Sequence, residues 1–138
     1  MLQKEEIQKL YDAALKVRLN SYSPYSKFKV GAALLLNDGN IIVGTNVENA
    51  SYGLTNCAER NALFLSISLG YKKNDIIALL VVADTDAPCS PCGACRQVIA
   101  ELMNKDAAVI LTNLKNDIKE LTVKELLPFS FSKDDLNV

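Results

Sequence analysis

Two cysteine motifs constrain the possible fold more than any other feature of the chain. Cys57 and Glu59 open one helical pattern, and Cys92 and Cys95 open another further along. Two cysteines three positions apart lie on one face of a helix, so both can hold the same metal ion. A third cysteine from a separate helix start completes a three-ligand set, which is typical of a catalytic zinc that keeps its fourth position for water. The fold must therefore bring two helix starts together.

Glu59 is the predicted catalytic residue. It follows the predicted ligand Cys57 by two positions, so it lies near the metal without having to bind it and can carry protons for a zinc-activated water. Three thiolates and one Zn²⁺ sum to about −1, and the neighbouring Arg60 is predicted to offset this charge by donating to a thiolate. Taken alone, Glu59 could instead end a capping box that starts at Asn56, and Arg60 could be a solvated surface charge.

Cys89 leaves a second set of ligands open, because it precedes Cys92 by the same three positions that separate Cys92 from Cys95. Four cysteines could build a closed structural zinc site. We prefer Cys92 and Cys95, because Ser90 and Pro91 are expected to start the helix and to leave Cys89 before the cap. Cys92 and Cys95 alone could also form a redox dithiol, but that reaction requires no third cysteine.

The composition limits the classes of function. With 138 residues and 49% hydrophobic content, residues 1–138 are predicted to form a single domain whose core needs no disulfide. We see no leader segment, and the longest apolar run, Ile76–Ala83, is too short to span a bilayer, so we expect a cytoplasmic protein with reduced thiols. A net charge of −1 offers no basic surface for nucleic acid and favours a small substrate. The absence of histidine excludes a Ser-His or Cys-His nucleophilic pair and a histidine ligand.

Hydrophobic patterning predicts an α/β fold, with a mixed sheet and helices on both of its faces. The predicted helices cover residues 5–19, about 56–69 and about 91–104, and the predicted strands cover 28–36, 41–47, 76–83 and 107–112. The turn residues at 37–40 predict a hairpin between the first two strands. The strand, helix, strand order predicts a parallel crossover between the last two strands. Thr122 and Glu125 form a plausible capping box for a short final helix.

The motifs together resemble those of the small, homotetrameric cytidine deaminases of the cytidine and deoxycytidylate deaminase family. The zinc deaminase signature pairs His-x-Glu, or an all-cysteine version, with Pro-Cys-x-x-Cys. The matching segments are Ser-Pro-Tyr-Ser-Lys-Phe at 23–28, Asn-Val-Glu-Asn-Ala at 46–50, Cys-Ala-Glu-Arg at 57–60 and Ser-Pro-Cys-Gly-Ala-Cys-Arg-Gln-Val at 90–98. The resemblance implies a three-layer α/β/α fold with a mixed five-stranded sheet, and one zinc per chain held by Cys57, Cys92 and Cys95.

The same resemblance implies hydrolytic deamination of free cytidine and deoxycytidine to uridine, deoxyuridine and ammonia, in the service of pyrimidine salvage. Zinc-bound hydroxide would add to C4 of the base, and Glu59 would pass the proton to ring N3 and to the departing ammonia. The implied substrate-binding residues are Phe28, Asn46, Glu48, the Ala58 backbone and Phe131. From the residues alone, Phe28 could equally be a core side chain, and Asn46 and Glu48 could be loop polar groups.

Two phenylalanines, Phe129 and Phe131, follow Pro128 in a polar tail. Both rings could pack on their own domain. The resemblance implies instead a homotetramer with shared active sites, in which Phe131 stacks on the base bound by a neighbouring subunit. Two other functional classes remain open. Deamination within a polynucleotide is disfavoured by the near-neutral charge and the 7% aromatic content. A zinc-stabilised binding module would not need Glu59.

Overall fold

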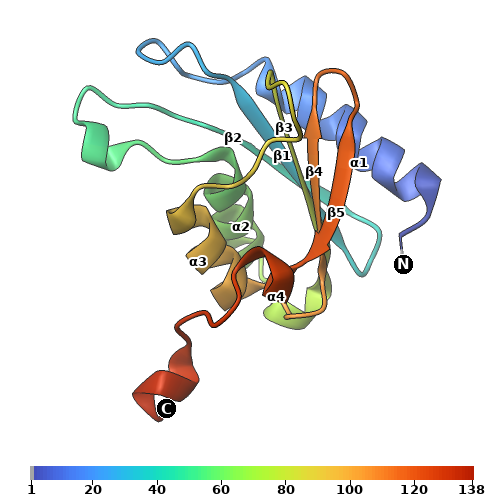
Figure 1. The fold of residues 1–138 in the computed structure, drawn as a ribbon, viewed down its shortest axis with the longest axis vertical. Helices are drawn as coiled ribbons and strands as arrows, with labels where there is room; N and C mark the ends of the chain where they lie inside the picture. Colours follow the sequence, from blue (N-terminus) through green and yellow to red (C-terminus); the bar gives the residue numbers. More distant parts are fainter. Residues whose placement is uncertain (1) are drawn as a thin grey trace.

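The computed structural model describes residues 2–138 and contains one five-stranded sheet with strand order β2-β1-β3-β4-β5 (Figure 1). The β3 and β4 strands run parallel, and the other three neighbouring pairs are antiparallel. The predicted mixed sheet and parallel crossover are therefore confirmed. The strands are β1 (Val30–Leu36), β2 (Ile41–Thr45), β3 (Ile76–Ala83), β4 (Ala108–Asn113) and β5 (Ile118–Thr122).

Helices cover both faces of this sheet and make three layers (Figure 1). The α1 helix packs on one face, and α2, α3 and α4 pack on the other. Within residues 2–138, no helix combines the length and the apolar character that crossing a membrane requires. The helices are α1 (Lys4–Arg18), α2 (Ala58–Ser68), α3 (Gly93–Leu102) and α4 (Val123–Leu126).

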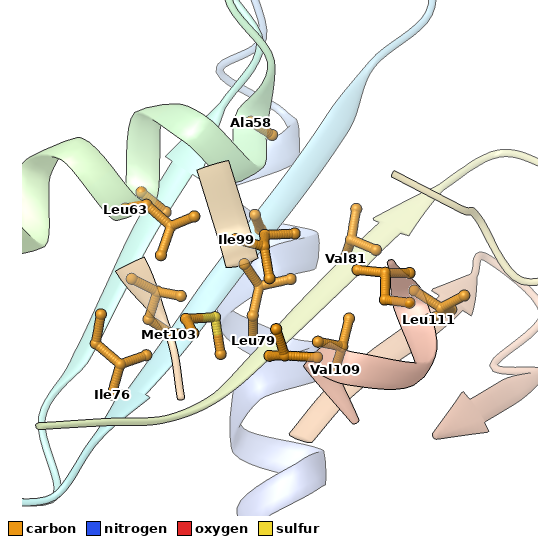
Figure 2. Packing of buried hydrophobic residues seen from close by; sticks show 14 of the residues in the cluster. Ala58, Leu63, Ile76, Leu79, Val81, Ile99, Met103, Val109 and Leu111 are labelled. Carbon is orange, nitrogen blue, oxygen red and sulfur yellow. The ribbon is translucent and has the colours of Figure 1, made fainter. Parts of the chain in front are cut away.

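The core divides into two clusters because successive side chains of a strand point to opposite faces. Leu34 of β1 packs in the cluster that contains Leu63 of α2 and Ile99 of α3, whereas its neighbour Leu35 packs with Leu10 of α1. Figure 2 shows the first cluster, in which side chains of α2 and α3 lie against β3 and β4. Burial of each large apolar side chain contributes about 1.5–3 kcal/mol, and this packing fixes α2 and α3 side by side over the sheet.

The predicted hairpin is confirmed, but its strands are shorter than the apolar runs. The turn uses Gly39 at φ +88°, a backbone conformation that glycine adopts without steric cost. The strands begin at Val30 and end at Thr45 instead of residues 28 and 47. The side chain of Asn46 replaces strand pairing there, since its Oδ1 accepts a 3.0 Å hydrogen bond from the Val30 amide.

The β5 strand has no counterpart among the four strands predicted from the residues. It forms an edge of the sheet, and its residues from Ile118 to Glu120 are exposed. Lys119 and Glu120 suit an edge position, because charged side chains there discourage pairing with another chain. The segment therefore lacks the apolar alternation on which the strand prediction depended.

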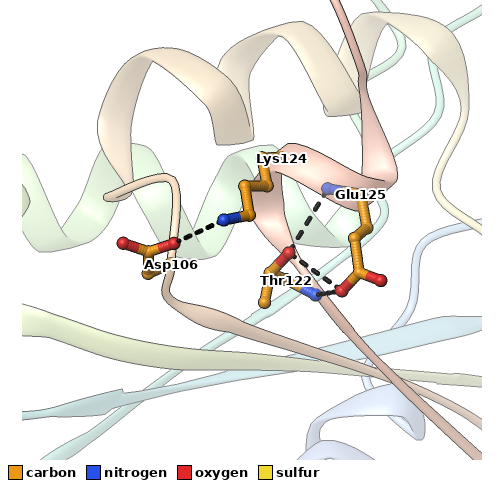
Figure 3. Close-up of polar contacts among 4 residues, drawn as sticks. All are labelled: Asp106, Thr122, Lys124 and Glu125. Carbon is orange, nitrogen blue, oxygen red and sulfur yellow. Dashed lines mark hydrogen bonds and ion pairs between the residues drawn. The ribbon is translucent and has the colours of Figure 1, made fainter.

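The short final helix forms as predicted from its capping box (Figure 3). The Glu125 amide donates to Thr122 Oγ1 at 3.3 Å, and the Thr122 amide donates to Glu125 Oε1 at 2.9 Å. An exposed ion pair of 3.1 Å joins Lys124 to Asp106, and pairs of this kind add about 0–1 kcal/mol. After α4 the chain extends away from the body as a C-terminal tail (Figure 1).

Candidate active site

The two helix starts meet, but each helix begins later than predicted. Cys57 is the N-cap residue of α2, and Cys92 is the N-cap residue of α3. The α2 helix begins two residues after the predicted start at about residue 56, because the Asn56 backbone pairs with Val47 through two 3.0 Å hydrogen bonds. The predicted cap at Ser90 is wrong, because the extended backbone of Cys92 takes that role. Both cysteines therefore lie at the positive end of a helix dipole, which stabilises thiolates.

Three thiols converge at this point. The Sγ atoms of Cys57, Cys92 and Cys95 all lie within 4.8 Å of one another, and those of Cys57 and Cys92 are 3.9 Å apart. Zinc holds thiolates at about 2.3 Å in tetrahedral geometry, which separates two sulfurs by roughly 3.8 Å. The donor set and its spacing thus fit zinc. Cys89 is buried and lies outside this group.

Arg60 connects the helix to the thiols. Its Nη2 donates to Cys57 Sγ at 3.2 Å, as the charge argument predicts, while its Nε is buried without a hydrogen-bond partner among residues 2–138. Hydrogen bonds from Cys95 and Arg60 lower the pKa of the Cys57 thiol to about 5, despite partial burial. The hydrogen bond to Cys57 and burial raise the pKa of the Cys95 thiol.

Glu59 is buried beside this cluster, with 4% of its surface exposed. Burial raises the pKa of its carboxyl to about 7, and the charge of Cys57 adds to the shift. Because α2 begins at Ala58, Glu59 is the second helical residue and takes no part in a capping box. The capping alternative is therefore wrong. A carboxyl with a pKa near neutrality can both accept and donate a proton.

The start of α2 is fixed directly on the β2 strand. A Cβ atom at Gly44 would lie 2.6 Å from the Ala58 carbonyl oxygen and 2.5 Å from the Ala62 amide nitrogen. Asn61 adds a 2.7 Å hydrogen bond from its side chain to the Thr45 carbonyl. Close backbone approach at a glycine thus sets the position of the helix turn that carries Glu59.

The predicted substrate residue Asn46 joins the segments around Phe28. Its Nδ2 donates to the Phe28 carbonyl at 2.7 Å, and its Oδ1 accepts from Ser21 Oγ at 2.6 Å as well as from the Val30 amide. One amide hydrogen of Asn46 remains for another partner. The Phe28 side chain is 42% exposed, so the alternative of a core phenylalanine is wrong.

Glu48 lies at the edge of a cavity of about 410 Å³. Its carboxylate accepts hydrogen bonds from the Tyr25 amide, the Ser26 amide and the Ser26 hydroxyl. Sequence reasoning did not single out Ser26 or these contacts, although the residue lies within the matched segment 23–28. The cavity is lined by Tyr25, Ser26, Glu48, Tyr52 and Thr55.

Phe131 is not among the residues that line the cavity beside Glu48. It lies in the C-terminal tail, is more than half exposed, and borders a second cavity of about 440 Å³ between α3, α4 and the tail. Gln97, two residues after Cys95, donates from its side chain to the Phe131 carbonyl at 2.9 Å. The predicted backbone contributor Ala58 is the first residue of α2, fully buried next to Glu59.

Comparisons with known proteins show the family of this chain. Residues 4–112 match the family model described as the cytidine and deoxycytidylate deaminase zinc-binding region. A cytidine deaminase of Halalkalibacterium halodurans is 57% identical over 94% of this chain and 97% of its own length. A cytidine deaminase of Sporosarcina psychrophila is 56% identical, with 96% of each chain covered.

A solved structure shares the fold. The crystal structure of a cytidine deaminase from Burkholderia pseudomallei superposes with a TM-score of 0.88 and 50% identity, covering 90% of this chain and 98% of that chain. The family model describes a zinc-binding region, and the three-thiol cluster lies within the residues that it matches. The chain thus belongs to the cytidine and deoxycytidylate deaminase family of zinc-dependent enzymes.

Proposed function

We propose that this protein catalyses hydrolytic deamination of free cytidine and deoxycytidine, giving uridine or deoxyuridine and ammonia, and so serves pyrimidine salvage in the cytoplasm. The observation that carries the proposal is the buried Glu59 next to three thiols that converge from two helix starts. The similarity to proteins named cytidine deaminase supports the choice of base. The net charge of −1 favours a free nucleoside over a polynucleotide.

We assign Cys57, Cys92 and Cys95 as the zinc ligands, one ion per chain. When bound there, zinc supplies a nucleophile at neutral pH by lowering the pKa of water. Three thiolates weaken that effect by their excess negative charge. The Arg60 guanidinium at Cys57 Sγ and the two helix dipoles offset part of this charge.

Glu59 has the role of proton carrier. The water oxygen forms a bond to C4 of the base while Glu59 takes a water proton and gives it to ring N3. Glu59 then takes the proton of the new C4 hydroxyl and gives it to the exocyclic amine, so that the C4 carbonyl forms while the bond between C4 and that nitrogen breaks and ammonia leaves. One carboxyl can act first as base and then as acid because burial brings its pKa close to the working pH.

The nucleoside is held on the other side of the site. Asn46 offers its remaining amide hydrogen and Glu48 its carboxylate to the sugar hydroxyls, and the exposed ring of Phe28 packs against the nucleoside. The Ala58 backbone helps to fix the base. Phe131 of a neighbouring subunit completes the site in a homotetramer. Exposed apolar side chains on α2, namely Phe64, Leu65 and Ile67, provide a surface for such an assembly.

The test is turnover by the purified zinc-loaded protein. Loss of the cytidine absorbance band should accompany release of ammonia, and deoxycytidine should give the same result. Zinc-loaded protein that releases no ammonia from either nucleoside would contradict the proposal and favour a binding module.

Glu59→Gln separates catalysis from binding. Glutamine is nearly isosteric but cannot carry a proton, so zinc content should stay at the wild-type level while kcat falls at least about a hundredfold. Retention of more than roughly a tenth of wild-type turnover would exclude Glu59 as the proton carrier, since a lost general acid and base costs more than this.

A further inference from the structure

Ser26 occupies the centre of a hydrogen-bond network at the sugar end of the proposed site. Its amide donates to Glu48 Oε1 at 3.1 Å, and its hydroxyl donates to Glu48 Oε2. The hydroxyl oxygen also accepts a 3.0 Å hydrogen bond from the Phe28 amide. One side chain thus contacts both Glu48 and the backbone of Phe28.

The network uses most of the acceptor capacity of Glu48. A carboxylate offers about four lone-pair sites. Tyr25 and Ser26 amides occupy two of them on Oε1, and the Ser26 hydroxyl occupies one on Oε2. Glu48 lines the 410 Å³ cavity and keeps one acceptor site for a ligand hydroxyl.

These contacts also favour the charged form of Glu48. The hydrogen bond from the Ser26 hydroxyl lowers the pKa of Glu48, and the two backbone amides add to the effect. A charged carboxylate accepts stronger hydrogen bonds than a neutral one.

The backbone between Ser26 and Phe28 has a conformation that the network stabilises. Lys27 has φ +60°, in the left-handed region that residues other than glycine rarely adopt. A hydrogen bond from the Lys27 amide to the Ser23 carbonyl and the one from Phe28 to Ser26 Oγ hold this turn. The turn directs the Phe28 amide back to the same hydroxyl that holds Glu48.

We propose that Ser26 is a positioning residue for sugar recognition, whose hydroxyl holds the Glu48 carboxylate and the Phe28 backbone in one arrangement. In this role Ser26 acts through Glu48, whose carboxylate it holds. The inference rests on the proposed function, in which Glu48 accepts a hydrogen bond from a sugar hydroxyl. Its consequence is that Ser26 sets how strongly the enzyme prefers a nucleoside with sugar hydroxyls.

The experiment compares cytidine with 2′,3′-dideoxycytidine, which lacks both ring hydroxyls. The readout is kcat/KM for cytidine divided by kcat/KM for 2′,3′-dideoxycytidine. Ser26→Ala should lower this ratio about fivefold or more, because Glu48 loses a hydrogen bond made in its charged form. The change should appear in KM for cytidine, with kcat within about twofold and zinc content unchanged, because the chemistry occurs at the thiol cluster. Ser26→Thr keeps the hydroxyl and should restore the ratio.

Glu48→Gln and the double variant identify the route of the effect. Glu48→Gln should lower the ratio at least as much as Ser26→Ala, and adding Ser26→Ala to it should cause no further change. If Glu48→Gln lowers the ratio but Ser26→Ala does not, the role of Ser26 is overturned and the proposed function stands. An unchanged ratio in Glu48→Gln overturns both the sugar contact and the role of Ser26, while deamination itself is judged by ammonia release.

Ser26→Cys repeats the test if Ser26→Ala fails to fold. It keeps a side chain of similar size with only a weak donor, so the ratio should again fall. A wild-type ratio in the folded Ser26→Cys protein would overturn the proposal. The proposal would also be overturned if the substitution of Ser26 lowered the ratio equally in the wild-type and Glu48→Gln backgrounds, because Ser26 would then act by another route.

Discussion

At the scale of single residues, the role proposed for each cysteine follows from its position relative to a helix start. Cys57 and Cys92 cap the two helices, and Cys95 lies in the first turn of α3, where its thiol reaches Cys57. Cys89 is held before the helix by its amide, which donates to the Thr112 carbonyl at 2.9 Å. Burial raises the pKa of its thiol to about 11, which disfavours the thiolate that a metal needs.

The first prediction follows from this arrangement. Cys92→Ser or Cys95→Ser should empty the zinc site, because a serine hydroxyl does not replace a thiolate ligand. Cys89→Ser is the matched control and should keep both zinc and activity. Zinc per chain is measured on the purified proteins by atomic emission. A Cys89→Ser protein that is purified without zinc would show that the ligand set is wrong.

The second prediction concerns Arg60, which donates to Cys57 Sγ. Arg60→Ala should lower zinc retention or kcat about tenfold or more, because partners of metal ligands typically contribute ten- to a hundredfold. Arg60→Lys keeps the charge and should lose less. Steady-state kinetics and zinc off-rates check both effects. A change confined to KM would place Arg60 in the substrate pocket instead of at the metal.

At the scale of elements, contact between α2 and β2 places the turn that carries Glu59, the proposed catalytic residue. The first turn of α2 packs directly on Gly44, so that a side chain at position 44 would clash with the helix backbone. The apolar cluster in Figure 2 holds α2 and α3 over the sheet. Because Cys57 and Glu59 belong to the start of α2, a displacement of α2 moves both relative to α3. We therefore expect protein stability and zinc binding to be coupled through Gly44.

The third prediction tests that coupling. Gly44→Ala should destabilise the protein by about 1–3 kcal/mol, as is typical of overpacking, and should weaken zinc retention. Gly53→Ala is the control, since a Cβ there meets no atom within 4 Å among the residues that the structure describes. Thermal unfolding and zinc content are compared for the two variants. A Gly44→Ala protein with wild-type stability and zinc content would contradict the coupling.

At the scale of the whole molecule, Phe131 lies apart from the other residues proposed for the active site of the same chain. Phe131 lies on the extended tail, and Phe129 is fully exposed. The α2 helix also exposes apolar side chains. In the proposed homotetramer, we expect contacts between subunits to cover these exposed side chains.

The fourth prediction is that Phe131→Ala weakens cytidine binding by roughly 1–3 kcal/mol, the range for stacking of a base on an aromatic ring. Zinc content should stay unchanged, and Phe129→Ala should alter binding less. Binding is measured by inhibition with a non-reactive cytidine analogue. Equal losses in the two variants would indicate a general effect of the tail.

Mixed assemblies test whether Phe131 acts in a neighbouring subunit. Phe131→Ala chains and Glu59→Gln chains are combined after subunit exchange has been confirmed. If the ring and the carboxylate belong to different subunits, some sites regain both and recover high-affinity turnover. A wild-type protein that sediments as a fully active monomer would contradict the shared site outright.

The sequence by itself determined the features that depend on local patterns. Apolar periodicity located α1, α2, α3 and β3, and turn residues located the hairpin. Thr122 and Glu125 identified the cap of α4. The spacing of Cys57, Cys92 and Cys95 predicted a common metal site, because three potential ligands at two helix starts have few other chemical uses.

Only the tertiary structure decided the remaining features, because they depend on contacts between segments far apart in the chain. Asn56 is kept out of α2 by pairing with Val47, and the β5 strand exists because β4 offers it a partner. Burial, which no local pattern measures, raises the pKa of Glu59. The contact between Ser26 and Glu48 spans 22 positions, and such a pair becomes visible only when folding brings its two hydrogen-bonding groups together.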